Sequence, residues 1–319
     1  METLLEIKNL SVKFKTEKNI CYALNGVNLT LNKGESLGLV GESGAGKTTT
    51  ALATLNLLPP KISQVTSGEI YYNGQNVFEM SKEELQAIRG KKIAMIFQNP
   101  LTSLNPVFTV GEQIAMLLRR HMGMNKKEAL ERAGELLETV GIAKYRLNDY
   151  PHQFSGGMRQ RVGIAAGLAC NPELLIADEP TTALDVTVQA QILELMKGLQ
   201  KEYSTSLLMI THNLGIISEL CQKVAVMYAG CIIEYGTVKE VFTHPAHPYT
   251  KGLLGAIPSL TGPRNRLNAI PGDVANSVSL PDGCKFHPRC SQCTQKCREE
   301  VPAMFKINDD HYVACYNRR

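Results

Sequence analysis

Alternating apolar and polar residues predict strands at the start of the chain. Residues 10–14 and 27–31 place an apolar side chain at every second position, and a polar segment, 15–19, separates them. A Tyr-Asn-Gly-Gln turn at 72–75, within residues 68–77, is typical of a hairpin. We therefore expect the first ~80 residues to be rich in antiparallel strands.

Further along the chain, short apolar runs alternate with helical periodicity. Runs at 36–40, 92–97, 174–177 and 206–211 predict buried strands, whereas residues 110–140 carry apolar side chains at helical spacing. Strands that alternate with helices predict a parallel sheet with its chemistry at the carboxyl ends of the strands. The expected fold class is α/β, with a helical segment in the middle of the chain.

Residues 41–48 read Gly-Glu-Ser-Gly-Ala-Gly-Lys-Thr and match the phosphate-binding loop pattern G-x-x-x-x-G-K-[ST] at every fixed position. An apolar run precedes the loop and a helix-compatible run, 47–58, follows it, which is the order that such a loop requires. Its backbone N–H groups surround the β- and γ-phosphates, its lysine adds a cation and its threonine hydroxyl binds Mg²⁺. The residues expected to contact nucleotide are Gly41, Glu42, Ser43, Gly44, Ala45, Gly46, Lys47, Thr48 and Thr49.

An aromatic residue upstream of the loop is a candidate to stack on an adenine ring. Phe14 is the first candidate and Tyr22 the second. A core-facing strand aromatic explains Phe14 equally well, so both interpretations stay open.

Composition narrows the class of protein. The chain has 319 residues, 44% hydrophobic and 20% charged, with a net charge of +4, so we expect a large globular domain with an appendage and no nucleic-acid partner. No apolar run approaches the ~20 residues that span a bilayer, and the N-terminus lacks a signal-peptide layout. We expect a cytosolic chain that reaches a membrane only through partner subunits.

Prolines recur through residues 245–281, which predicts a domain boundary near residue 243.

The nine cysteines are unevenly distributed. Four are scattered, and five fall in the tail at Cys284, Cys290, Cys293, Cys297 and Cys315. Because cytosolic thiols stay reduced, the tail cluster predicts metal binding before disulfides.

Five further motifs follow the phosphate loop in a fixed order. They are Gln98 after a strand, Phe154 to Met158 before a helix, Asp178-Glu179 at a strand end, Ala183 to Asp185, and His212 after a later strand. Together they resemble the ATP-binding subunits of ABC transporters, and the resemblance covers residues 5–242. It implies an ABC domain at 1–242, with a core of 1–98 and 171–242, a helical subdomain at 99–170, and a loop-rich, metal-binding extension at 243–319.

The resemblance assigns a role to each motif. Asp178 would hold Mg²⁺ together with Thr48 and Gln98, and Glu179 would activate the attacking water. Gln98 would also sense the membrane partner, and His212 would reach the γ-phosphate.

The same resemblance implies that two ATPase subunits share each site. Ser155, Gly156 and Gly157 of one subunit close on the ATP held by the other, so we expect hydrolysis only in a hetero- or homodimer. The first and fifth signature positions depart from the common Leu-Ser-Gly-Gly-Gln, with Phe154 and Met158, but the serine hydroxyl and glycine amides remain.

Three segments are similar to the dipeptide and oligopeptide importer ATPases: Phe-Ser-Gly-Gly-Met-Arg-Gln-Arg at 154–161, residues 97–106, and His-Pro-Tyr-Thr-Lys-Gly-Leu-Leu at 247–254. Leu57-Leu58-Pro59-Pro60 favours the first of their two ATPase subunits. The resemblance implies two membrane-spanning permeases, a substrate-binding protein that acts indirectly, and a peripheral position on the cytoplasmic face of the plasma membrane. A nickel importer is the alternative.

The tail also resembles that subfamily, in which four cysteines are thought to hold an iron–sulfur cluster. The corresponding residues are Cys284, Cys290, Cys297 and Cys315. Four thiolates suit [4Fe–4S] or Zn²⁺ equally, but the long gaps between them favour the cluster. Cys293 keeps an alternative ligand set open. A redox-sensing soluble ABC ATPase is the alternative from another functional class.

Overall fold

The computed structural model describes residues 2–99, 103–181, 186–256 and 270–317. The chain divides into two compact units. The first unit contains Met1–Leu4, Leu31–Ser36 and Glu79–Ile210, and the second contains Leu5–Thr30, Leu37–Phe78 and Thr211–Arg319. The domain boundaries expected from the sequence stay predictions.

The first unit contains three parallel strands that pair side by side. Strand β6 (Ile93–Ile96) pairs with β7 (Leu174–Asp178), which pairs with β8 (Ser206–Ile210). Every residue of β7 and β8 is buried, as expected for strands covered on both faces. Because the strands are parallel, the residues that follow β6 and β7 emerge at one edge of the sheet.

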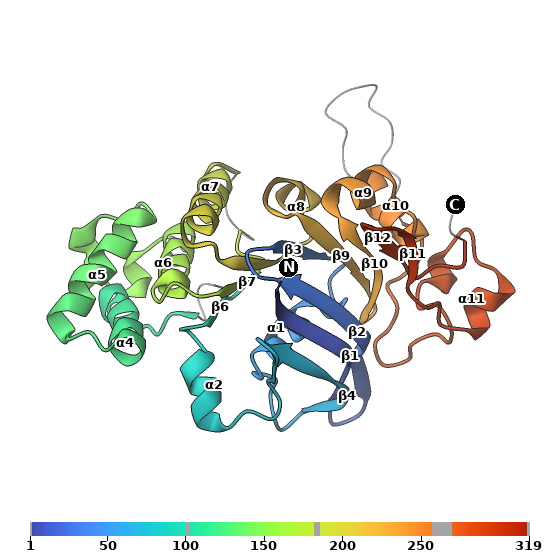
Figure 1. The fold of residues 1–319 in the computed structure, drawn as a ribbon, viewed down its shortest axis with the longest axis horizontal. Helices are drawn as coiled ribbons and strands as arrows, with labels where there is room; N and C mark the ends of the chain where they lie inside the picture. The colour runs from blue at the N-terminus through green and yellow to red at the C-terminus, as the bar shows by residue number, and fades with distance from the viewer. Residues whose placement is uncertain (1, 100–102, 182–185, 257–269, 318–319) are drawn as a thin grey trace. The chain divides into compact units, whose positions relative to one another are not determined.

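Helices α4 (Val110–Met122), α5 (Lys126–Thr139) and α6 (Gly156–Leu168) pack together in the first unit (Figure 1). The predicted helical segment at 110–140 is therefore two helices. Gly123 ends α4 in the left-handed region at φ 68°, and Asn125 begins α5 with a capping box. The remaining elements of this unit are α2 (Lys82–Ile88), η1 (Lys144–Asn148), η2 (Pro151–Gln153) and α7 (Val186–Tyr203).

The second unit begins with the predicted antiparallel strands. β1 (Thr3–Lys15) lies between β2 (Ile20–Asn32) and β4 (Ser63–Tyr72), and β4 pairs with β5 (Gln75–Asn76). Asn73 and Gly74 have φ of 46° and 77°, the conformation of a type I′ turn. The hairpin predicted from this turn is confirmed.

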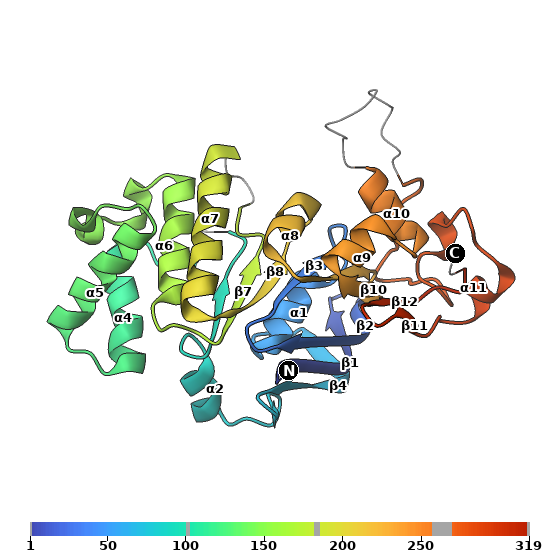
Figure 2. The ribbon, with the colours of Figure 1, turned by 45° about the horizontal axis from the view of Figure 1, so that its top comes forward.

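A second group of strands in this unit leads from the phosphate loop to the tail. β3 (Ser36–Val40) runs parallel to β9 (Lys223–Tyr228), followed by antiparallel β10 (Cys231–Thr237), β12 (His311–Val313) and β11 (Phe305–Asn308). Helix α9 lies beside β10 (Figure 2). The other elements are α1 (Lys47–Thr54), α8 (Leu214–Leu220), α9 (Val238–Thr243), α10 (Pro248–Gly255), η3 (His287–Arg289) and α11 (Gln295–Glu299).

Helix α1 is shorter than the helix-compatible run at 47–58 predicted. It ends at Thr54, and Asn56 already has a positive φ of 49°. Asparagine tolerates this conformation better than most residues, so the chain turns before the two prolines.

A buried carboxylate fixes the start of the tail to the strands. Glu234 on β10 accepts hydrogen bonds from the backbone N–H groups of Ala246 and His247, at 2.7 and 2.9 Å. Its Oε1 lies 2.7 Å from His311 Nε2 on β12, and both side chains are buried. Residues 246–247 and β12 are thus held to the same strand.

Candidate nucleotide-binding site

The phosphate loop connects the buried strand β3 to α1. Lys47 is only 7% exposed, and its Nζ donates to the carbonyl oxygens of Gly41 and Glu42 at 2.8 and 3.0 Å. The N–H of Ala45 also donates to the Glu42 carbonyl, at 3.2 Å. The loop thus curls around its own lysine, at a helix N-terminus that favours an anion.

Two glycines of the loop are required by close packing. A Cβ on Gly41 would lie 2.2 Å from the carbonyl oxygen of Met227, and a Cβ on Gly46 would lie 2.7 Å from that of Ala23. Both residues have positive φ, 155° and 107°. The backbone of β9 and β2 therefore shapes the loop.

Glu42, at a variable position of the loop pattern, has two partners from the tail. Its N–H donates to Tyr249 Oη at 2.9 Å, and its carboxylate accepts from both terminal nitrogens of Arg289, at 2.7 and 3.2 Å. The carboxylate of Glu42 raises the pKa of Arg289 above its usual range. The tail thus contacts the phosphate loop directly.

The ends of β6 and β7 bring two predicted catalytic residues together. Gln98 Nε2 donates to Glu179 Oε2 at 3.0 Å. Asp178 is the last residue of β7 and is buried. Glu179 has a φ of 45°, and its N–H donates to Ile210 at 2.8 Å. A positive φ in a glutamate costs about 1–3 kcal/mol, and such strain concentrates at functional sites.

His212 and Phe14, two further predicted site residues, lie in the second unit. His212 is exposed and follows Thr211, whose N–H donates to Leu39 of β3, so it emerges at the same strand end as Gly41. Phe14 is half-buried on β1, opposite Ser63 of β4. Three roles stay predictions. They are base stacking by Phe14, contact of His212 with the γ-phosphate, and a magnesium site formed by Thr48, Asp178 and Gln98.

The signature segment begins α6. Ser155 Oγ accepts a hydrogen bond from the N–H of Met158 at 3.3 Å and so caps the helix. Ser155 and Gly156 are exposed, and a Cβ on Gly156 would meet no atom within 4 Å among the described residues. This is an open helix N-terminus that presents N–H groups to solvent.

Arg146 contacts both unusual signature residues. Its guanidinium lies 4.2 Å from the ring centre of buried Phe154, and its Nη1 lies 3.4 Å from the sulfur of Met158. It also pairs with Asp149 at 2.7 Å and donates to the Gln153 carbonyl at 3.1 Å. The two departures from the common motif therefore share one cationic partner.

The four predicted cluster ligands line one small cavity in the tail. Cys284, Cys290, Cys297 and Cys315 surround it, together with His247 and Phe286, whereas Cys293 does not line it. Burial raises the pKa of Cys284 to about 11, and burial also raises the pKa of Cys290 and Cys315. The neighbouring thiols add to each of these shifts.

Among the described residues, no group of three or more histidine, cysteine or acidic side chains is arranged to hold a metal ion.

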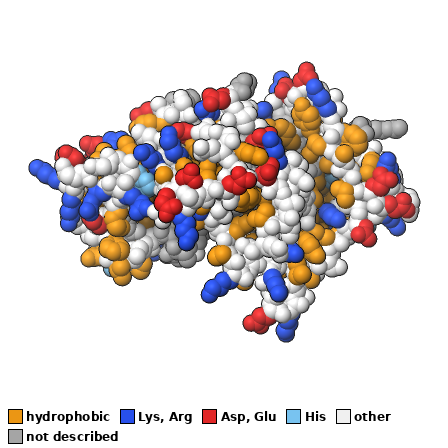
Figure 3. Space-filling view, turned by 60° about the horizontal axis from the view of Figure 1, so that its bottom comes forward, with side chains coloured by type: hydrophobic (Ala, Val, Ile, Leu, Met, Phe, Trp, Pro, Cys, Tyr) orange, Lys and Arg blue, Asp and Glu red, His pale blue; other side chains and the backbone are white. Residues whose placement is uncertain are grey.

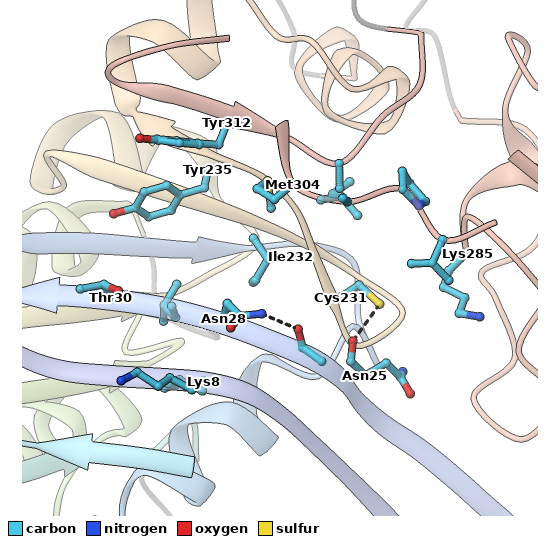
Figure 4. Close-up of a pocket in the computed structure, with 18 of the residues that line it drawn as sticks. Lys8, Asn25, Asn28, Thr30, Cys231, Ile232, Tyr235, Lys285, Met304 and Tyr312 are labelled. Carbon is cyan, nitrogen blue, oxygen red and sulfur yellow. Dashed lines mark hydrogen bonds between the residues drawn. The ribbon is translucent and has the colours of Figure 1, made fainter. Parts of the chain in front are cut away.

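A larger cavity of about 760 Å³ adjoins the cysteines in the second unit (Figure 4). Asn25, Asn28 and Thr30 of β2 line one side, and Ile232 and Tyr235 of β10 line another. Met304 and Tyr312 contribute from the tail. Cys284 lines both this cavity and the small one, so the two cavities share one cysteine.

Sequence reasoning missed the contacts that the tail makes with the loop. The segment that contains Tyr249 indicated only a resemblance to the peptide importer ATPases. Nothing in the residue spacing connected Arg289 to Glu42, which is 247 positions away. The predicted motif Ala183 to Asp185 lies outside the described residues, as do positions 100–102 of the segment that follows Gln98.

Two families match the chain. The family described as "ABC transporter" matches residues 24–182, and "Oligopeptide/dipeptide transporter, C-terminal region" matches residues 233–297. The chain is 51% identical over 313 residues to an oligopeptide transport ATP-binding protein, OppD, of Bacillus subtilis, covering 97% of this chain and 87% of the relative. It is 49% identical to the OppD of Haemophilus influenzae, covering 99% and 98%.

Solved structures agree with the family matches. The ATP-binding cassette MJ0796, in a dimeric post-hydrolysis state bound to ADP and phosphate, has a TM-score of 0.66 and 31% identity to this chain. The match covers 73% of this chain and 98% of the cassette. The protein cbiO1 of Clostridium perfringens, described as part of the ABC transporter complex cbiONQ, has a TM-score of 0.64 and 27% identity, covering 76% of this chain and 92% of cbiO1.

Proposed function

The chain belongs to the ATP-binding proteins of ABC transporters, and we propose that it hydrolyses ATP to power the import of oligopeptides through membrane-spanning partner subunits. The names of its relatives and the match to the oligopeptide/dipeptide C-terminal region support peptide as the substrate. Among the described residues, no helix is long and apolar enough to cross a membrane. We place the chain at the cytoplasmic face of the membrane, held there by its permeases.

The observation that carries the ATPase assignment is the loop of residues 41–48 curled around buried Lys47. Its N–H groups and Lys47 would hold the β- and γ-phosphates, and bound Mg²⁺ would neutralise phosphate charge. Glu179 accepts from Gln98 at a strand end, where its carboxylate can take a proton from an attacking water. Thr48, Asp178 and Gln98 would supply the oxygen ligands that Mg²⁺ prefers.

The exposed start of α6 supports a site shared between two subunits. Ser155, Gly156 and Gly157 lie at a helix N-terminus that favours an anion, and the phosphate loop around Lys47 is a separate anion site in the same chain. We propose that this segment closes on ATP held by a second ATPase subunit, which is the same chain or a related one. The dimeric cassette with ADP and phosphate is a precedent for two nucleotide-binding cassettes in one assembly.

The face drawn in Figure 3 gives no support to a nucleic-acid partner. Lysine and arginine side chains are mixed there with aspartate and glutamate, whereas nucleic-acid binding proteins gather basic side chains in large patches or stripes.

Replacing Glu179 by Gln tests the proposed chemistry. The amide is nearly isosteric but cannot accept the proton, so we expect ATP affinity to be kept and turnover in the assembled transporter to fall ~100-fold, about 2.7 kcal/mol of barrier. ATP affinity and steady-state turnover are measured on the same preparation. Unchanged turnover would refute the role of Glu179.

We propose that the tail holds an iron–sulfur cluster through Cys284, Cys290, Cys297 and Cys315. The support for this is that the four thiols line one cavity, and that thiolates are the ligands such a cluster takes. A bound cluster would supply covalent cross-links in a tail poor in apolar residues. Iron, sulfide and absorbance near 400 nm in the purified protein would support it; zinc alone would refute it.

A further inference from the structure

Glu42 is held by the tail although the chemistry of phosphate binding does not require a carboxylate there. Its charge lies within the loop expected to bind a polyphosphate, where it would repel the ligand. Arg289 compensates for this charge with two hydrogen bonds. Its side chain is only 6% exposed, so the pair is shielded from solvent better than a surface ion pair.

Arg289 is itself fixed in one position. Its Nε donates to the Pro271 carbonyl at 3.1 Å, and its guanidinium lies 5.9 Å from the ring centres of Tyr228 and Phe286. Tyr249 packs against the same two rings, at centroid distances of 4.7 and 5.4 Å. One aromatic cluster therefore orients both tail residues that contact Glu42.

The turn that carries Arg289 also carries two of the clustered cysteines. The N–H of His287 donates to the Cys284 carbonyl at 2.9 Å, and the N–H of Cys290 donates to the His287 carbonyl at 3.2 Å. Cys284 is further joined to Cys297 by a backbone hydrogen bond of 2.8 Å. The backbone that orients these thiols thus also sets the position of Arg289.

We propose that Arg289 and Tyr249 are positioning residues for the phosphate loop, and that through them the cysteine-bearing turn sets the affinity of the loop for nucleotide. This inference rests on the proposed role of residues 41–48. The mechanism has two parts: Arg289 neutralises the charge of Glu42, and Tyr249 fixes the backbone of Glu42, whose carbonyl in turn accepts from Lys47.

The first experiment removes the guanidinium. Arg289→Gln should weaken the binding of MgADP by about fivefold, a typical coupling between two sites, with increased hydrogen exchange at residues 41–48. Arg298→Gln is the matched control, because Arg298 is exposed in the same tail and should leave both quantities unchanged. Wild-type affinity in Arg289→Gln would overturn the inference.

The second experiment separates charge compensation from damage to the fold. Removing the carboxylate as well, in Arg289→Gln/Glu42→Gln, should restore affinity to within about twofold of wild type, because no repelling charge remains. A double variant as weak as Arg289→Gln, or weaker, would overturn the role given to the pair. Tyr249→Phe should increase hydrogen exchange at the backbone amides of Glu42 and Ser43 and leave exchange in the rest of the chain unchanged. Wild-type exchange at Glu42 and Ser43 would contradict the role of Tyr249.

A third experiment tests the link to the cysteines. Cys290→Ser should weaken MgADP binding and increase exchange at residues 41–48, and adding Arg289→Gln should weaken binding no further. Additive losses would overturn the link. If Cys290→Ser does not fold, the two Arg289 variants still decide the inference.

Lys47→Ala separates this inference from the proposed site. If Lys47→Ala loses MgADP binding while Arg289→Gln keeps it fully, the site stands and the inference fails. If Lys47→Ala binds MgADP like wild type, the site itself is wrong.

Discussion

The phosphate loop and the signature segment are both anion-binding helix starts, but only the first is enclosed by its own chain. The loop is shaped by backbone contacts to Met227 and Ala23, contains a buried lysine and is held by two tail residues. The signature segment has an exposed serine and an exposed glycine with open space around it. A site built to bind alone needs such enclosure, whereas a surface built to close on a partner's ligand must stay open.

The two segments should therefore respond differently to mutation. Changes in the loop should alter the affinity of the isolated chain for nucleotide. Changes in the signature should alter turnover of the assembled transporter and leave that affinity unchanged.

The largest effect is expected from Lys47→Ala. Loss of the buried ammonium should weaken ATP binding ~1,000-fold, about 4 kcal/mol, because a charge-assisted contact to phosphate is lost in an enclosed site. Isothermal titration of the isolated chain measures it, with exposed Lys18→Ala as control. An affinity within tenfold of wild type would show that the loop does not depend on its lysine.

Gly156→Glu should act only in the assembled transporter. The position accommodates a side chain, and an acidic group in the first turn of a helix favours the helix. The carboxylate would nevertheless repel a partner's γ-phosphate, so turnover should fall ~100-fold while ATP affinity of the isolated chain is kept. Gly156→Ala is the neutral control. Weaker binding by the isolated Gly156→Glu chain would contradict the division between the two segments.

Arg146→Gln, which also alters the signature segment, should have a smaller effect on turnover. Without the guanidinium, Phe154 and Met158 lose their shared partner and the start of α6 is less well positioned. We expect turnover to fall about tenfold, or 1.4 kcal/mol, with nucleotide affinity unchanged. Lys144→Gln, at a more exposed cation of the same segment, should turn over normally. Equal losses in both variants would indicate a general defect.

The stability of the chain should also depend on pH, through His247 in the tail that contacts the phosphate loop. Burial lowers the pKa of His247 to about 3, so between pH 6.5 and 3 the unfolded chain binds a proton that the folded chain does not. Stability is therefore full above pH 6.5 and falls on acidification, by about 1–2 kcal/mol near pH 5. Urea unfolding at pH 7 and 5 measures it. His247→Asn, whose side-chain oxygen can accept the Tyr249 N–H in place of the histidine Nδ1, should show a smaller fall; an equal fall would exclude His247 as the cause.

Local patterns predicted the strands, the hairpin and the phosphate loop because their signals lie within a few residues. The Asn73-Gly74 turn and the alternation along β1 are examples. The sequence also predicted parallel strands with chemistry at their carboxyl ends, and the structure places Glu179 next to Gln98 at such an edge. The helical segment at 110–140 was predicted as one pattern, and the break at Gly123 was missed because periodicity does not show an interruption of a few residues.

The contacts between distant segments could not be predicted from one sequence. Glu42 and Arg289 are of residue types that usually lie at the surface, and only the packing of Phe286 against Tyr228 and Tyr249 brings them together. Glu234 and His311 were equally hidden, because neither lies in a motif. Such pairs depend on tertiary structure and leave no periodic signal.

The most direct test determines whether the signature segment of one subunit acts on the nucleotide bound by its own subunit or by the partner. In an assembled transporter whose two ATPase subunits differ in size, Gly156→Glu is introduced into this chain alone, and photoreactive 8-azido-ADP is trapped with vanadate. The account predicts that label is lost from the unaltered subunit and kept on the altered one. Loss of label from the altered subunit itself would contradict a site closed by the partner's signature.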